Sequence, residues 1–298
     1  MSRMMWEKRQ PLNVFYQSQR RAAHLSLADA SERIASTSAL SRFETGRARL
    51  SANSFFQLLN LLPSTFNSLQ HAYLPPADIS YYQRIIYAAT LTATRPDAAT
   101  IRRLLNEEKK AYAATGLIHH RLNIADLVVT FNLCYPLTPQ EIIADVQPYL
   151  QGITRFGLYE LNLLATMVRV LPLSATIGFI QRILLNPEYS YVDTWAEQYI
   201  WLIISNSVAT AVARGDFASA KQIMGLANWL RIPATDPQTH LYQTFYELCL
   251  QYHAGQRHQA QAGIDHLLSG LRLIGDPFFT QLIHEGWRLF LTVEEAVA

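Results

Sequence analysis

Two groups of side chains near the N-terminus could together bind phosphate. Three arginines fall within eight residues of one another: Arg42, Arg47 and Arg49. Three hydroxyl residues come just before them: Ser36, Thr37 and Ser38. Guanidinium groups bind phosphate oxygens, and hydroxyls at the start of a helix can donate to phosphate or contact base edges. A basic surface that only faces solvent would contain the same arginines. The stretch 36–50 is therefore a candidate nucleic-acid contact, and its surroundings have to supply a suitable frame.

The residues around this stretch predict five short helices. Their expected ranges are 12–23, 26–34, 36–45, 51–62 and 64–73. Ser26, one of Ser36 to Ser38, and Ser51 or Asn53 are suited to cap the N-termini of the second, third and fourth helices. Gly46 is suited to the left-handed position that ends the third helix. Five short helices in about seventy residues, with a tight turn before the third, match the helix-turn-helix arrangement.

The third predicted helix also carries a family motif. The run SALSRFETG resembles the signature of the Rgg family of bacterial transcription regulators, S-x-S-Q-[IL]-S-R-F-E-x-G. The matching positions are Ser36, Ser38, Leu40, Ser41, Arg42, Phe43, Glu44 and Gly46. Arg20 and Ser26 also stand where the family keeps an Arg in helix one and a Ser opening helix two. The likeness is strong over residues 12–62 and extends to the remainder only as a pattern of helices.

Framework and DNA-contacting roles can be separated by chemistry. Leu40 and Phe43 are expected in the core. Glu44 is expected to be the structural partner of Arg20, because a carboxylate that faced phosphate would be repelled. The residues expected to contact DNA are Ser26, Ser36, Thr37, Ser38, Ala39, Arg42, Arg47 and Arg49.

Ala39 departs from the family motif. The family has Gln at this position, and a Gln side chain can form a bidentate contact with adenine, whereas an Ala methyl can only touch a thymine methyl or leave space. The operator sequence is therefore expected to differ from that of the family, or base readout to be weak.

The rest of the chain predicts an all-α second domain. Leu74-Pro75-Pro76 is the clearest linker, because paired prolines hold an extended segment and exclude a helix. We therefore expect a DNA-binding domain at 1–73, a linker at 74–77 and a repeat domain at 78–298. Helical patterns alternate with short breaks, strand-type alternation is not sustained, and the segments beginning at Gly215 and Gly255 resemble each other 40 residues apart. This pattern indicates an α-solenoid of tetratricopeptide-like helix pairs.

Polar residues at helical spacing mark a second candidate site in this domain. They lie among Leu, Ile and Met, a mixture that suits a short apolar peptide better than solvent, although a solvated outer face would show the same spacing. The residues predicted to contact such a peptide are Asn123, Arg155, Tyr159, Asn162, Arg169, Gln198, Trp201, Asn206, Gln243 and Tyr246. The Rgg resemblance implies the same kind of ligand, a small secreted signalling peptide that has been imported into the cytosol.

Composition limits the other functions. Residues 1–73 carry a net charge of +5 and residues 74–298 one of −3, which favours an anionic partner at one end. No secretory signal and no membrane span are expected, and Cys134 and Cys249 lack metal-binding spacing. No phosphate loop or nucleophile motif occurs, so neither an enzyme nor a metal or other cofactor is expected.

The sequence therefore predicts a cytoplasmic, homodimeric transcription regulator that binds double-stranded DNA and is controlled by a short hydrophobic signalling peptide, as in quorum sensing. The apolar residues of the last helix are expected to contribute to the dimer contact: Phe278, Phe279, Trp287, Leu289 and Phe290. Two alternatives stay open. One is a DNA-binding regulator without a peptide ligand, and the other is a protein-interaction scaffold with a degenerate helix-turn-helix.

Overall fold

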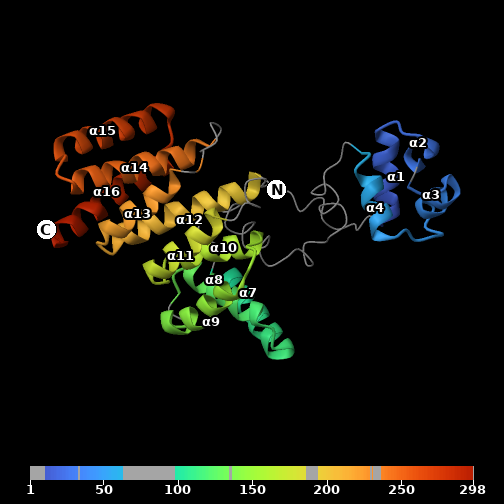
Figure 1. Cartoon of the computed structure of the whole chain (residues 1–298), viewed down its shortest axis with the longest axis horizontal. Helices are drawn as coiled ribbons and strands as arrows, with labels where there is room; N and C mark the ends of the chain where they lie inside the picture. The colour runs from blue at the N-terminus through green and yellow to red at the C-terminus, as the bar shows by residue number, and fades with distance from the viewer. Residues whose placement is uncertain are drawn as a thin grey trace. The chain divides into compact units, whose positions relative to one another are not determined.

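The computed structural model describes residues 11–32, 34–62, 98–133, 136–185, 194–228, 230 and 236–297. Every regular element in these ranges is an α-helix, in agreement with the predicted fold class (Figure 1). The chain divides into two compact units, residues 1–96 and 97–298, which are described separately below. The helix predicted at 64–73 and the linker predicted at 74–77 lie outside the described residues, so the predicted domain boundaries stay a prediction.

The described part of the N-terminal unit contains four short helices. They are α1 (Leu12–Ala22), α2 (Leu27–Ser31), α3 (Thr37–Glu44) and α4 (Ala52–Leu59). Ser26, Ser36 and Ser51 cap α2, α3 and α4, each accepting a hydrogen bond from the backbone N–H three residues further on. The prediction for α2 was too long, because Glu32 has an extended backbone (ψ 119°) that ends the helix at Ser31.

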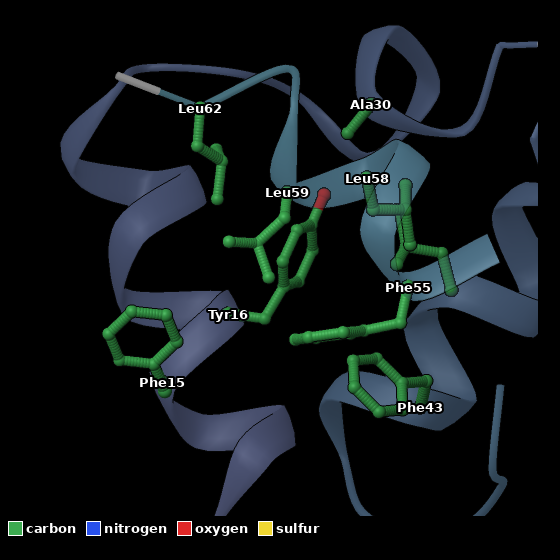
Figure 2. Packing of buried hydrophobic residues seen from close by; sticks show 9 residues of the cluster. Phe15, Tyr16, Ala30, Phe43, Phe55, Leu58, Leu59 and Leu62 are labelled. Atoms are coloured by element: carbon green, nitrogen blue, oxygen red, sulfur yellow. The ribbon is translucent and has the colours of Figure 1, made fainter. Parts of the chain in front are cut away.

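Aromatic rings fill the core of this unit. Its buried residues are Phe15, Tyr16, Ala30, Leu40, Phe43, Phe55, Leu58, Leu59 and Leu62. Figure 2 shows the rings of Tyr16, Phe43 and Phe55 gathered in the interior, and their centroids lie 6.1–6.4 Å apart. Tilted and edge-to-face pairs at this distance add to the burial of apolar area. Because the three rings come from α1, α3 and α4, they fix α3 against the rest of the unit.

The described part of the C-terminal unit is a series of α-helices. The described helices are α7 (Ala98–Thr115), α8 (Ile118–Thr130), α9 (Pro139–Gly152), α10 (Leu158–Met167), α11 (Leu173–Leu184), α12 (Thr194–Ala213), α13 (Phe217–Ala227), α14 (Pro237–His253), α15 (Arg257–Ile274) and α16 (Pro277–Val297). Neighbours in sequence pack together as α7 with α8, α12 with α13 and α14 with α15, and α12 also contacts α10 and α14 (Figure 1). Stacked helical hairpins of this kind form an α-solenoid.

The internal repeat inferred from the sequence corresponds to two equivalent hairpins. Gly215 ends the turn after α12 with φ +71°, and Gly255 does the same after α14 with φ +90°. Ala220 of α13 and Ala260 of α15 are both fully buried, where a small side chain lets two helices approach closely. The 40-residue spacing is therefore the length of one hairpin.

Two further observations concern the cysteines and the length of the helices. Cys249 is a free, buried thiol, and burial raises its pKa, whereas Cys134 lies outside the described residues. Among the helices that the structure describes, none combines the length and the apolar character needed to cross a bilayer.

Candidate functional site

The N-terminus of α3 presents four of the residues predicted to contact DNA. The Ser36 side chain accepts from the backbone N–H of Ala39 at 3.1 Å, so it caps the helix. Ser36, Thr37 and Ser38 are exposed, and Ala39 is half-buried in the first turn. The positive end of the helix dipole therefore opens onto a surface of hydroxyl groups, an arrangement that can bind an anion or a base edge.

Hydroxyls in this region already have partners inside the unit, and Ser36 Oγ lies 3.1 Å from Ser38 Oγ. Ser26 Oγ lies 2.5 Å from Asp29 Oδ2 and completes a capping box, and Ser26 lowers the pKa of Asp29 by this hydrogen bond. Thr37 Oγ1 lies 3.0 Å from Ser31 Oγ and so connects α3 to α2. In this arrangement, Ser26 is a capping residue whose hydroxyl already has a partner in Asp29.

The predicted phosphate-contacting arginines lie at the other end of α3. Gly46, with φ +74°, ends the helix in a Schellman motif in which Arg47 N–H donates to the Arg42 carbonyl and Gly46 N–H to the Phe43 carbonyl, both at 2.8 Å. The side chains of Arg42, Arg47 and Arg49 are exposed. The tight turn brings the backbone of Arg47 against that of Arg42, and Arg42 Nε donates to the Ser38 carbonyl of the preceding turn at 3.3 Å.

A buried ion pair holds this end of α3 onto α1. Arg20 Nε lies 2.6 Å from Glu44 Oε1, and the two side chains are 8% and 3% exposed. Arg20 Nη2 donates to Glu44 Oε2 at 2.8 Å, and Arg20 Nη1 donates to the carbonyl of Leu25. Asn13 and Gln17, which precede Arg20 on α1, donate to the Glu44 carbonyl and carboxylate. Glu44 is thus the structural partner of Arg20, as predicted from the sequence.

In the C-terminal unit, part of the predicted peptide-contacting set belongs to a buried polar network. Asn123 is 4% exposed, its amide donates to Glu108 Oε2 at 3.0 Å, and its carbonyl accepts from the Tyr159 hydroxyl at 2.9 Å. His120 Nδ1 lies 2.8 Å from the same carboxylate oxygen. The prediction for Asn123 was wrong for this structure, because a hydrogen-bonded polar group in the core has the same helical spacing as a polar surface stripe.

Two further residues of the predicted set lie differently from what their helical spacing indicates. Trp201 is only 4% exposed, so its indole packs in the core of the unit. Arg155 is exposed but lies outside a helix, because α10 begins only after its N-cap Gly157, whose backbone N–H donates to Glu160 Oε2 at 2.9 Å. It therefore does not share a helical face with Tyr159 and Asn162. Gln198 is exposed on α12, and the half-buried Gln243 donates to Glu247 Oε1 at 2.9 Å.

Three other residues of the predicted set line a pocket of about 310 Å³, whereas Asn162, half-buried on α10, is not among its lining residues. Its walls come from α12, α14 and α16 and from the turn directly after α10. Arg169, Asn206 and Tyr246 line it, as does Thr210, and the apolar wall includes Leu289 and Val293 of α16. The α16 residues were not predicted to contact a ligand. The sequence did contain a signal for them, because Leu289 and Val293 are apolar residues four positions apart on one helix.

A buried carboxyl lies within electrostatic reach of this pocket. Asp126 of α8 is 2% exposed, and its Oδ1 accepts no hydrogen bond from any described residue. Burial raises the pKa of this carboxyl to about 7, opposed in part by a hydrogen bond from Thr166 and by the charge of Arg169. Arg169 therefore influences both the pocket and the core beside it.

A basic helix-turn-helix unit and an α-solenoid in one chain define a class of protein, the helix-turn-helix transcription regulators with a helical-repeat domain. The sequence profile described as "HTH-type transcriptional regulator Rgg, C-terminal domain" matches residues 102–285. Because this match covers more than half of the chain, the protein belongs to the Rgg family. The family consists of transcription regulators and not of enzymes. No curated protein matches the chain at a significant level.

Solved structures share the fold at low sequence identity. The Streptococcus dysgalactiae SHP pheromone receptor Rgg2, in a cysteine-to-serine variant, is 16% identical, with a TM-score of 0.75 over 94% of this chain and 99% of the receptor. A Listeria monocytogenes protein described as a transcriptional regulator is 14% identical (TM-score 0.73, 95% and 98% covered). PrgX in complex with cCF10 is 12% identical (TM-score 0.70, 95% and 92% covered).

Proposed function

We propose that this regulator binds double-stranded DNA through α3 and the turn after it, under the control of a short apolar peptide held by the repeat domain. The observation that carries the DNA-binding part is that Arg42 in the last turn of α3, and Arg47 and Arg49 just after it, are all exposed, while the N-terminus of the same helix presents hydroxyl groups. In helix-turn-helix proteins, the second helix of the motif enters the major groove while neighbouring groups contact phosphate.

Support for the peptide comes from the pocket in the repeat domain and from the relatives. The pocket combines apolar walls with a few polar groups, which is the composition of sites for small amphipathic ligands. Among the similar structures, Rgg2 is described as a pheromone receptor, and PrgX was solved with cCF10. A peptide that binds one state of the repeat domain more tightly shifts the equilibrium toward that state. If the two states differ in their affinity for DNA, the peptide thereby changes DNA binding.

The proposed regulator acts in the cytoplasm as a homodimer. Two DNA-binding domains on adjacent half-sites bind DNA more tightly than one domain, whose affinity is modest. The predicted dimer contact through α16 needs a correction. Trp287 and Phe290 are 7% and 1% exposed, so they pack inside their own chain, and Phe278 and Leu289 are the exposed large residues of that set.

Selection of DNA tests this proposal. The full-length protein, incubated with sheared genomic DNA from the organism that encodes it, is expected to retain a small set of fragments. A pool of apolar octapeptides is then expected to change the affinity for those fragments about tenfold, a coupling of roughly 1.4 kcal/mol. Retention of fragments with no effect of any peptide would favour the regulator without a peptide ligand. Failure to retain any fragment would favour the scaffold.

A further inference from the structure

We propose that the pocket between α12, α14 and α16 binds the C-terminal end of the peptide, with the terminal carboxylate on Arg169 and the last apolar side chains against α16. This inference rests on the proposed function, because it assigns a subsite to the same ligand. It goes further by fixing which end of the peptide enters the pocket and which surface receives the residues before it.

The charge in the pocket selects an anionic group. Among the described residues that line it, Arg169 alone carries a charge. Two of the neutral polar side chains already donate a hydrogen bond within the protein. Asn206 Nδ2 donates to the Ala165 carbonyl at 2.8 Å, and Thr210 Oγ1 donates to the Asn206 carbonyl at 2.7 Å. The guanidinium of Arg169 is therefore the charged donor of the site, and a carboxylate is its natural partner in a peptide.

The size of the pocket favours the end of a chain. A volume of about 310 Å³ is at the lower limit of ligand pockets, so it holds only a small part of a peptide. A terminal carboxylate also places a charge directly beside the last side chain. A charge next to an apolar side chain matches this pocket, which is lined both by the cation of Arg169 and by the apolar Leu289 and Val293.

The surface of α16 continues the apolar wall beyond the pocket. The buried stripe of this helix is Ile283, Trp287, Phe290 and Glu294. A second stripe, at spacings of three and four, runs along a different face: Phe278, Leu282, Gly286, Leu289, Val293 and Val297. Phe278 and Leu289 are 65% and 56% exposed, and Gly286, Leu289 and Val293 line the pocket. From residue 278 to residue 289 the helix rises about 16 Å, which matches about five extended residues.

The geometry therefore orients the peptide. Its carboxyl end lies at Arg169, and the residues before it run along this stripe, past the half-buried Gly286, toward the exposed Phe278. A side-chain carboxylate from Asp or Glu shares the chemistry of the terminus, so the experiment has to distinguish these two sources.

Affinity selection with defined peptide pools tests the assignment on the full-length protein. Three octapeptide pools draw every position from Ile, Leu, Val, Phe, Gly and Ser. The first ends in a free carboxylate and the second in a carboxamide, and the third is amidated but has Asp as its last residue. Retained peptides are quantified by mass spectrometry. We expect the free-acid pool to be enriched at least tenfold over the amide pool and over the Asp pool.

Matched variants connect this preference to the named residues. Arg169→Met is expected to abolish the tenfold preference for the free acid, and Arg169→Lys to keep part of it. Arg288→Met removes an exposed cation of α16 outside the pocket and is expected to leave the preference unchanged. Leu289→Glu is expected to lower retention of the free-acid pool, whereas Leu273→Glu, at a 91% exposed site on α15, is not.

The possible outcomes separate this inference from the proposed function. Equal enrichment of the free-acid and amide pools, or of the free-acid and Asp pools, overturns the assignment of the terminus while peptide control stands. Enrichment of no pool over a blank resin overturns both. A Leu289→Glu variant that turns a dimer into a monomer with unchanged peptide retention would show that the stripe is a dimer contact instead.

Discussion

Replacing Arg20 with Met is expected to destabilise the N-terminal unit by about 3–5 kcal/mol, the usual cost of removing one partner of a buried ion pair. The variant leaves Glu44, with 3% of its side chain exposed, as a charge without its counter-ion. The carbonyl of Leu25 also loses the hydrogen bond from the guanidinium. Because Glu44 is the last residue of α3, this end of the helix is expected to detach from α1 first.

Hydrogen–deuterium exchange measures this effect in the full-length protein, because peptides from α3 report on the N-terminal unit and peptides from α15 report on the other. Arg21→Met is the matched control, since Arg21 is the next residue of α1 and is exposed. We expect faster exchange across α3 in Arg20→Met, with α15 unchanged. The double variant Arg20→Met, Glu44→Leu is expected to recover much of the loss, because apolar residues can replace a buried pair. Equal exchange in Arg20→Met and Arg21→Met would contradict a stabilising role for the pair.

The second large effect is expected from Asp126→Asn, and it depends on pH. The folded protein holds this carboxyl in a buried site that raises its pKa from 3.8 to about 7. The unfolded chain therefore loses the proton near pH 4, whereas the folded chain keeps it until about pH 7. Between these values the folded state binds more protons, so the free energy of unfolding falls as pH rises. The full penalty, present above pH 7, is roughly 4 kcal/mol for a shift of about three pKa units.

Asn keeps a neutral carbonyl oxygen at the position and removes this penalty. We expect Asp126→Asn to leave the free energy of unfolding of the C-terminal unit almost unchanged at pH 3.5 and to increase it progressively up to pH 8. Urea titrations followed by tryptophan fluorescence measure the difference at each pH. Asp265→Asn, at an exposed position of α15, serves as the control and is expected to change stability by less than about 0.5 kcal/mol throughout. A gain that does not grow with pH would show that Asp126 is not held in its neutral form.

The N-terminal unit could be predicted closely because its signals are local in the sequence. Capping serines, a helix-ending glycine and apolar residues at helical spacing define α1 to α4 within two or three residues. The pairing of Arg20 with Glu44 was predicted from two arguments: phosphate would repel a carboxylate, and the Rgg resemblance places an Arg in the first helix.

The candidate site in the repeat domain could be predicted only in part. Helical spacing shows which residues share a face, but it does not show whether that face meets solvent or another helix. Asn123 and Trp201 lie on faces that are covered by neighbouring helices, so they are buried. Arg169, Asn206 and Tyr246 come together from three places in the chain, and only the stacking of hairpins brings them to one pocket. The position of Leu289 in the pocket wall was missed, because this apolar residue was assigned from the sequence to the dimer contact.

The central claim is that the end of α3 binds the phosphate backbone of DNA, and the salt dependence of binding tests it most directly. The measurement compares the affinity of the wild-type protein and of Arg42→Ala for a selected DNA fragment and an unrelated one, between about 50 and 200 mM salt. Arg272→Ala, on the exposed surface of α15, is the control. Arg42→Ala is expected to weaken binding to both fragments and to reduce the slope of log affinity against log salt by about one for each lost phosphate contact. An unchanged affinity and slope in Arg42→Ala would show that α3 does not lie on DNA in this way.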